Sequence, residues 1–341
     1  MDEMIGDIGE FELIDRINHL LLEEGTAMPT GTLGIGDDCA AFNPRPGYEI
    51  LLTCDCIVEG RHFLPEHISP FELGRRAMTQ NISDVGAMGG HPLYALISLG
   101  LKKETLVSHV LEIYRGFTAE LNPFRAAIIG GNMTRSEGPV FIDITIIGEV
   151  EAGKMVRRSG AKAGNAILVT GFPGQSAAGL RLLNQSSGNE DLKDHPLVRA
   201  YNRPSHRAFE GEKIARSGLA TAMIDISDGL LGDLGHICKE SGVGAQLFQE
   251  QLPVSPILQQ VSSRMGCDPL DFVLSDSDDY ELLLTCLPEN AGTICALISQ
   301  TGKISATQIG TTTPNPNTME LVQADGTRRP LHPSGWDHFA N

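Results

Sequence analysis

The sequence predicts a two-domain α/β protein. Its 341 residues correspond to roughly two domains of ordinary size, and 41% of them are hydrophobic, which is enough to build sizeable cores. Helical and strand-like patterns alternate along the chain, and the alternation restarts near Gly153 after a strand at 140–150. We therefore expect a first domain over residues 1–150 and a second over residues 151–341.

The first half opens with a helix and then alternates. Apolar residues at helical spacing between Gly9 and Gly25 predict an amphipathic helix, and a buried strand from Tyr48 is expected to end at Asp55. Ser69-Pro70-Phe71-Glu72 is a capping box with proline at the first helical position, so a helix that carries Asp84 should begin there. The remaining expected elements are a strand at 93–101, a helix at 106–121, strands at 126–129 and 140–150, and a glycine turn at 130–135 suited to phosphate contact.

The second half repeats the alternation. We expect a strand at 166–170, a helix after Gly174, a mobile loop at 184–195 and a strand at 282–286. Another strand should end near Asp225, with a helix starting about Leu230. Serine and aspartate are preferred helix N-caps, so capping is the simplest structural role for Ser227 or Asp228.

The net charge and the pattern of cysteines argue against several classes of function. A formal net charge of −17 argues against a nucleic-acid partner, because phosphate backbones require clustered lysine and arginine. No apolar run approaches the ~20 residues of a membrane span, and the first ten residues are acidic, so we expect a cytoplasmic protein without a membrane partner. The seven cysteines include no CxxC pair, and Cys54 and Cys56 share one face of a strand, where packing is the expected role.

Acidic turns recur along the chain. The Gly34-Ile35-Gly36-Asp37-Asp38 stretch, taken alone, is more simply a solvated surface turn than a ligand site, since glycine and aspartate are common turn residues. Similar carboxylates return at Asp55, Asp84, Asp225/Asp228 and Asp278/Asp279, which suggests oxygen-ligand sites for a hard cation such as magnesium with a nucleotide. The sequence has no GxxxxGK[ST] motif, no GxGxxG after a strand, and no GxSxG or HExxH motif. If the protein is a phosphoryl-transfer enzyme, we therefore expect it to work by metal positioning and charge neutralisation rather than through a covalent intermediate.

An ordered set of motifs carries a family resemblance. It comprises Gly34-Ile35-Gly36-Asp37-Asp38, Thr53-Cys54-Asp55, Val58-Glu59-Gly60, His62-Phe63, Asn81-Ile82-Ser83-Asp84, Arg158-Ser159-Gly160-Ala161, Asp225-Ile226-Ser227-Asp228-Gly229-Leu230, Asp279-Tyr280-Glu281-Leu282 and Trp336-Asp337-His338-Phe339. Together they resemble the thiamine-monophosphate kinase family, in that family's order and over nearly the whole chain. The resemblance implies an aminoimidazole ribonucleotide synthetase-like fold, in which an amino-terminal domain forms a dimeric β-barrel, a carboxy-terminal α/β domain lies beside it, and ATP lies between the domains.

The resemblance also implies a set of site residues. Magnesium would be held by Asp38, Asp55, Asp84, Asn132, Asp225 and Asp228, with Thr53 and Cys54 close to it. ATP would contact Asp37, Tyr114, Gly131, Asn132, Arg158 and Ser227. Thiamine monophosphate would contact His62, Asp278 and Trp336, with the indole of Trp336 stacked on the cationic ring system. From the residues alone, His62 beside Phe63 is more simply a structural histidine.

The implied reaction transfers the γ-phosphate of ATP to thiamine monophosphate in line, giving thiamine diphosphate and ADP. The resemblance implies no catalytic base, which is chemically reasonable. A phosphate acceptor has a second pKa of about 6, so it is already largely an oxyanion at neutral pH. The remaining difficulty is the approach of two anions, which bound magnesium relieves.

Three motifs depart from the family pattern. Asn132 replaces an aspartate, Asp276-Ser277-Asp278 replaces Gly-Gly-Glu, and Cys54 replaces a small hydroxyl residue. Loss of the glycines matters if those positions need a positive φ. Two alternatives therefore stay open: a diverged ATP-dependent kinase or synthetase acting on another small acceptor, and a catalytically weak nucleotide-binding paralogue.

Overall fold

A computed structural model describes residues 3–25, 31–35, 39–185, 192–300, 304–316 and 318–332. The chain divides into two compact units. Unit 1 comprises Met1–Val85 and Gly90–Ala152, and unit 2 comprises Gly86–Gly89 and Gly153–Asn341. Three residues with expected site roles, Asp37, Asp38 and Trp336, lie outside the described residues.

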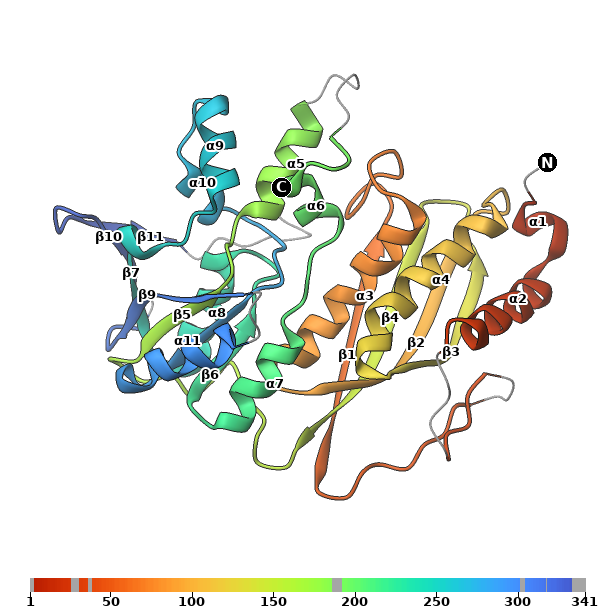
Figure 1. Cartoon of the computed structure of the whole chain (residues 1–341), viewed down its shortest axis with the longest axis horizontal. Coiled ribbons are helices and arrows are strands. Elements are labelled where there is room, and N and C mark those ends of the chain that lie inside the picture. Colours follow the sequence, from red (N-terminus) through yellow and green to blue (C-terminus); the bar gives the residue numbers. More distant parts are fainter. Residues whose placement is uncertain are drawn as a thin grey trace. The chain divides into compact units, whose positions relative to one another are not determined.

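Unit 1 is built on a four-stranded sheet with the order β1-β4-β2-β3 (Figure 1). The β2–β3 pair is parallel and the other two pairs are antiparallel. Helices α3 and α4 lie along one face of this sheet, and α2 packs beside α4. The bounds are α1 Ile5–Ile8, α2 Glu10–Glu23, β1 Tyr48–Val58, α3 Pro70–Ala87, β2 His91–Leu101, α4 Val107–Leu121, η1 Asn122–Phe124, β3 Ala127–Arg135 and β4 Phe141–Glu151.

The predicted start of α3 is confirmed. The backbone N–H of Ser69 donates to Glu72 Oε2 at 3.1 Å, and the N–H of Glu72 donates to Ser69 Oγ at 3.3 Å. These reciprocal bonds satisfy two of the N–H groups that a helix start leaves without helical partners. Along α3, Met78 and Ile82 are fully buried, so the helix is anchored on its apolar side and holds Asp84 at a fixed depth.

Two strands of unit 1 are longer than expected. Strand β1 does not end at Asp55, because its ladder with β4 continues from Asp55 opposite Ile144 to Val58 opposite Phe141. The expected glycine turn at 130–135 is also wrong, since β3 runs straight through these residues beside β2. Gly131 serves close approach instead, because a β-carbon there would lie 2.0 Å from the carbonyl oxygen of Ile97.

The second face of the unit 1 sheet is only partly covered. Tyr94 and Ile147 belong to a small apolar cluster, in which the rings of Phe42 and Tyr94 have centroids 4.8 Å apart. Further along this face, however, Leu52 is 70% exposed and the Cys54 thiol is exposed, so the expected packing role of this cysteine is wrong. Within the described residues of the single chain this sheet is open, and its four strands do not close into a β-barrel.

Unit 2 contains a seven-stranded mixed sheet of order β11-β10-β7-β9-β5-β8-β6 (Figure 1). Its strands are β5 Ala166–Thr170, β6 Ala220–Asp225, β7 Gly244–Phe248, β8 Leu282–Cys286, β9 Ala306–Thr313, β10 Met319–Val322 and β11 Arg328–Leu331. Its helices are α5 Gln175–Gln185, α6 Pro196–Asn202, α7 Ala208–Ser217, α8 Leu230–Ser241, η2 Gln249–Gln251, α9 Pro256–Met265, α10 Pro269–Val273, η3 Pro288–Asn290 and α11 Ala291–Ser299.

Helices cover both faces of the unit 2 sheet. One core joins the sheet to α5, α6, α8, α9 and α10, and a second joins it to α7 and α11. The strands predicted at 166–170 and 282–286 are confirmed. The loop expected from residue 184 is wrong at its start, because Asn184 and Gln185 complete α5, and residues 186–191 lie outside the described ones. Among the described helices, none has both the length and the apolar character needed to cross a membrane.

Candidate active site

Unit 1 brings three of the expected site residues together on the face that carries α3. Alternation along β1 places Thr53 and Asp55 on the same face. Thr53 Oγ1 donates a hydrogen bond of 2.5 Å to Asp84 Oδ2 on α3. The backbone N–H of Asp55 donates to Asn81 Oδ1 at 3.1 Å, which ties the strand to the same helix. Two carboxylates and a hydroxyl therefore share one region, with oxygen donors of the kind that magnesium prefers.

Two other expected site residues lie on the opposite face of the same sheet. The strand register aligns Cys56, Asp143, Ser98 and Asn132 in one row. Asp55 belongs to the adjacent row, so its side chain points the other way. Cys54 shares the face of Cys56, and its Sγ donates to Asp143 Oδ1 at 3.0 Å. Within unit 1, Asn132 and Cys54 are therefore not grouped with Asp55 and Asp84.

His62 and Tyr114 have local structural contacts. The Nδ1 atom of His62 accepts a hydrogen bond of 3.0 Å from the backbone N–H of Val58, in the turn that follows β1. Tyr114 is buried on α4, and its ring meets Phe117 edge-on at 5.2 Å. Burial raises the pKa of the Tyr114 hydroxyl, so it stays protonated and can act only as a neutral hydrogen-bonding group.

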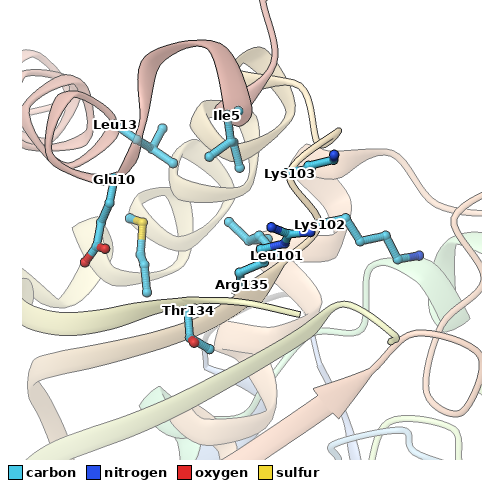
Figure 2. Close-up of a pocket in the computed structure, with 10 residues that line it drawn as sticks. Ile5, Glu10, Leu13, Leu101, Lys102, Lys103, Thr134 and Arg135 are labelled. Carbon is cyan, nitrogen blue, oxygen red and sulfur yellow. The ribbon is translucent and has the colours of Figure 1, made fainter. Parts of the chain in front are cut away.

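A separate cavity of about 190 Å³ lies in unit 1 between α1, α2 and the ends of β2 and β3 (Figure 2). Its wall is mainly apolar, with Ile5, Leu13 and Leu101 among the lining residues. The cations at its edge already have anionic neighbours. Lys102 contacts Glu59 at 2.8 Å, Lys103 contacts Glu104 at 3.6 Å, and Arg135 contacts Glu137 at 2.7 Å. We therefore do not include this cavity in the candidate active site.

Unit 2 groups its own expected site residues where β6 passes into α8. Asp225 ends β6 and is 2% exposed, while Ser227 and Asp228 are half-buried in the following turn. The N-cap of α8 is Gly229, with a φ of +111°, and no side chain caps this end. The alternative in which Ser227 or Asp228 is the N-cap of α8 is therefore wrong.

Asp233, in the first turn of α8, is a residue that sequence reasoning missed. Its Oδ2 accepts hydrogen bonds from the backbone N–H groups of Ser227 at 3.1 Å and Asp228 at 3.2 Å. Burial raises the pKa of Asp233 to about 7, and the charge of Asp228 adds to this shift. Potential ligand atoms of Asp228, Asp233 and His236 all lie within 4.8 Å of one another. The sequence does contain a signal for Asp233. A carboxylate there lies among Leu230, Leu234 and Ile237, on the apolar face of a predicted helix.

The acidic turn before β8 lies against the Ser227–Asp228 turn. A β-carbon at Gly229 would lie 2.6 Å from the carbonyl oxygen of Ser275 and 3.1 Å from the backbone nitrogen of Ser277. Only glycine permits this approach at a positive φ. The structure thus places together two motifs that are about fifty residues apart in the sequence. One of them contains Asp228 and the other contains Asp278.

The departures at 276–278 do not strain the backbone. Among the described non-glycine residues, a positive φ occurs only at Arg125 and Tyr280, so Asp276 and Ser277 need no glycine. Ser277 Oγ accepts a hydrogen bond of 3.2 Å from the N–H of Ala177 at the start of α5. Asp278 accepts a hydrogen bond from the Ser176 hydroxyl, which fixes the shorter side chain against the same helix.

Two buried acidic residues, Asp279 and Glu281, flank Tyr280 and hold the acidic turn before β8 in place. Asp279 accepts hydrogen bonds from the N–H groups of Gly174 at 2.6 Å and Ser176 at 3.0 Å, and burial raises its pKa to about 6. Glu281 binds the Arg207 guanidinium through two contacts of 2.5 and 2.6 Å. Paired bonds of this kind hold both groups in one geometry, so the acidic turn is a rigid part of unit 2.

Arg158 approaches the same region from the start of unit 2. Its carbonyl oxygen accepts a hydrogen bond of 3.2 Å from Ser241 Oγ at the end of α8. The neighbouring carbonyl of Arg157 accepts from the N–H of Met223 on β6 at 2.9 Å. The Arg158 guanidinium is close enough to oppose the rise in the pKa of Asp233. Unit 2 therefore gathers Arg158, Ser227, Asp228 and Asp278 around one strand–turn–helix.

The fold and these acidic turns define a class of protein. Residues 36–150 match the family model for the N-terminal domain of AIR synthase related proteins, and residues 162–321 match the model for the C-terminal domain. The expected two-domain, aminoimidazole ribonucleotide synthetase-like α/β fold is confirmed at this level.

Comparison with individual relatives identifies the family within this class of protein. A thiamine-monophosphate kinase from Salmonella typhimurium is 37% identical over 339 residues, which cover 97% of this chain and 98% of the relative. The crystal structure of thiamine-monophosphate kinase from Stenotrophomonas maltophilia matches with a TM-score of 0.80 at 32% identity, over 94% of this chain and 98% of the other. A structure of AaThiL complexed with AMPPCP and TMP matches with a TM-score of 0.75 at 32% identity, over 98% of both chains. The chain belongs to the thiamine-monophosphate kinase family, as its motifs suggested.

Proposed function

We propose that this chain is an ATP-dependent phosphotransferase that converts thiamine monophosphate and ATP into thiamine diphosphate and ADP. Family membership over nearly the full length supports this activity, and a relative has been solved with AMPPCP and TMP. The observation that carries the proposal is the approach of Gly229 to Ser275 and Ser277, because it joins the Asp228 turn to the Asp278 turn. A phosphate-handling group and an acceptor-recognising group would then lie within one site.

Magnesium is the cofactor that the donor atoms favour. Carboxylate and hydroxyl oxygens are hard donors, and the grouping of Thr53, Asp55 and Asp84 in unit 1 fits such an ion. When bound, the ion neutralises phosphate charge and aligns the transferred group. In unit 1 the residues that would hold magnesium are Asp38, Asp55, Asp84 and Thr53, and in unit 2 they are Asp225 and Asp228. Asn132 and Cys54 are left out of this set, because both lie on the face of the unit 1 sheet opposite to Asp55.

The remaining site residues bind and orient the substrates. We assign Asp37, Tyr114, Gly131, Asn132, Arg158 and Ser227 to ATP, and His62, Asp278 and Trp336 to thiamine monophosphate. The Asp278 carboxylate complements a cationic ring system, and its hydrogen bond with Ser176 holds it in place. The acceptor phosphate is already an oxyanion at neutral pH, so no residue of the chain has to remove a proton from it.

We also propose that unit 1 pairs with a second copy of the chain to close a β-barrel. The open face of its sheet exposes 70% of Leu52, and β1 and β3 are both edge strands. Exposed apolar surface beside free strand edges is typical of an interface. In light scattering, the native protein should have the mass of a dimer, and Leu52→Asp should shift it toward the monomer. A native monomer at micromolar concentration would contradict this assignment.

The activity is tested by magnesium-dependent conversion of thiamine monophosphate to thiamine diphosphate, with Asn132→Asp and Asn132→Ala variants alongside. Turnover by the native protein that is lost in Asn132→Ala would support the kinase and a role for the amide oxygen. Turnover only in Asn132→Asp would support the alternative of a weak nucleotide-binding paralogue, which Asn132 itself favours. ATP binding without turnover in any of the three proteins would count against this acceptor.

A further inference from the structure

Asp233 occupies a position where an apolar residue would be expected. Its neighbours on the buried side of α8 are Leu230, Leu234 and Ile237, and Asp233 itself is 1% exposed. Burying a carboxylate is costly unless hydrogen bonds replace its lost hydration. Here both replacing bonds come from the turn before the helix, from the N–H groups of Ser227 and Asp228.

These two bonds act on the backbone from which the site side chains project. Gly229, the N-cap, has no side chain that could hold the turn from within. Asp233 reaches back from the first helical turn, and its own N–H donates to the carbonyl oxygen of Gly229 at 3.0 Å. The carboxylate and this backbone bond thus close a ring around the turn. The orientation of both peptide groups is then set by one side chain.

We propose that Asp233 is the positioning residue of the Ser227–Asp228 turn: by accepting both backbone N–H groups, it sets the direction of the Asp228 carboxylate and the Ser227 hydroxyl. This inference rests on the proposed function, in which Asp228 holds magnesium and Ser227 contacts ATP. In this role Asp233 acts through these two neighbours rather than through a contact with substrate. The rival role is that of a direct metal ligand, since Asp228, Asp233 and His236 have potential ligand atoms within 4.8 Å.

Three variants separate the two roles. Asp233→Asn keeps a carbonyl oxygen that can accept the N–H groups but removes the negative charge. Asp233→Ala removes the acceptor. If the alanine variant does not fold, Asp233→Ser, which has only a short hydroxyl acceptor, takes the place of that variant. The matched control is Asp325→Ala, which removes one carboxylate that accepts from the N–H of Thr327 at 2.8 Å. Asp325 lies between β10 and β11, at the sheet edge opposite β6.

Two readouts are needed, and neither depends on turnover. Amide hydrogen exchange in the ligand-free protein reports the bonds to the N–H groups of Ser227 and Asp228. Titration with Mn²⁺ alone, followed by electron paramagnetic resonance, reports the metal affinity. In Asp233→Ala, both amides should exchange faster, and the Kd for Mn²⁺ should rise about 10- to 100-fold, as is usual when the support of a metal ligand is lost. Asp233→Asn and the control should remain close to the native protein in both readouts.

Two outcomes would overturn the inference. Native exchange and native Mn²⁺ affinity in Asp233→Ala would show that the turn holds its geometry without Asp233. Protected amides together with a Kd for Mn²⁺ as weak in Asp233→Asn as in Asp233→Ala would show that the charge binds the metal directly. Failure of the proposed function gives a different pattern: thiamine monophosphate is not phosphorylated, while the exchange and Mn²⁺ results still separate the two variants.

Discussion

In unit 1, Asp84 is held by the hydroxyl of Thr53 from a neighbouring strand, whereas in unit 2 the Asp228 turn is held through its backbone by the buried Asp233. The first arrangement fixes a carboxylate directly and leaves it half-buried on a helix. The second arrangement fixes the main chain, and it uses an additional carboxylate, that of Asp233, to do so. The comparison shows that similar acidic motifs need different supports, because a helix is rigid by itself and a turn is not.

The largest effect should come from removing either supported carboxylate. Asp84→Asn and Asp228→Asn should each lower kcat for thiamine monophosphate by about 100-fold or more, since each removes a carboxylate proposed to hold magnesium, and the positive charge of magnesium relieves the repulsion between phosphates. Steady-state kinetics at saturating magnesium would measure this. Asp325→Asn serves as the control, because it changes charge equally in an exposed hairpin. If only one of the two variants loses activity, only one of the two units contributes a carboxylate that the reaction requires.

The support in unit 1 can be tested separately. Thr53→Val removes the hydroxyl that donates to Asp84 at 2.5 Å but keeps the shape of the side chain. We expect the magnesium concentration for half-maximal activity to rise about tenfold, with a smaller change in kcat. Thr53→Ser restores the donor and should recover most of the native value. Equal behaviour of the valine and serine variants would show that the hydroxyl does not position Asp84.

The sequence predicted those features that depend on residues close together in the chain, and it did not predict those that depend on distant segments. The capping box at Ser69 and Glu72 and the apolar strand at 282–286 depend on near neighbours, and both are confirmed. Strand β1 continues past Asp55 only because β4 pairs with it, and the sequence of β1 does not contain that information. The approach of Gly229 to Ser275 and the role of Asp233 likewise depend on segments that meet only after folding.

The buried acids of unit 2 should make stability depend on pH. Burial raises the pKa of Asp279 to about 6 from its ordinary value of 3.8, so in this window the folded protein binds a proton that the unfolded chain has released. The free energy of unfolding should therefore fall as pH rises from about 4 to 6, by on the order of 2 kcal/mol from this group. In Asp279→Asn, urea unfolding at several pH values should show a flatter profile. An unchanged profile would contradict the assignment to Asp279.

The smallest effect should come from the serine that replaces a family glycine. Ser277→Gly removes the acceptor for the N–H of Ala177, which is 3.2 Å from Ser277 Oγ. Loss of one such cap should cost about 0.5–1 kcal/mol in the free energy of unfolding, measured with urea. We expect the KM for thiamine monophosphate to stay near the native value, because Asp278 keeps its own bond to Ser176. A change in KM with unaltered stability would instead make Ser277 part of acceptor recognition.

The start of α5 has a consequence for where a substrate anion can bind in this chain. Many nucleotide-binding proteins receive a phosphate at an open helix N-terminus, where free N–H groups and the helix dipole attract it. In this chain Asp279 and Ser277 already accept from Gly174, Ser176 and Ala177, so the protein supplies its own anion there. A substrate phosphate would have to displace a carboxylate to use this helix. A substrate phosphate is therefore expected to bind elsewhere, at groups such as the proposed ATP contacts Ser227 and Arg158.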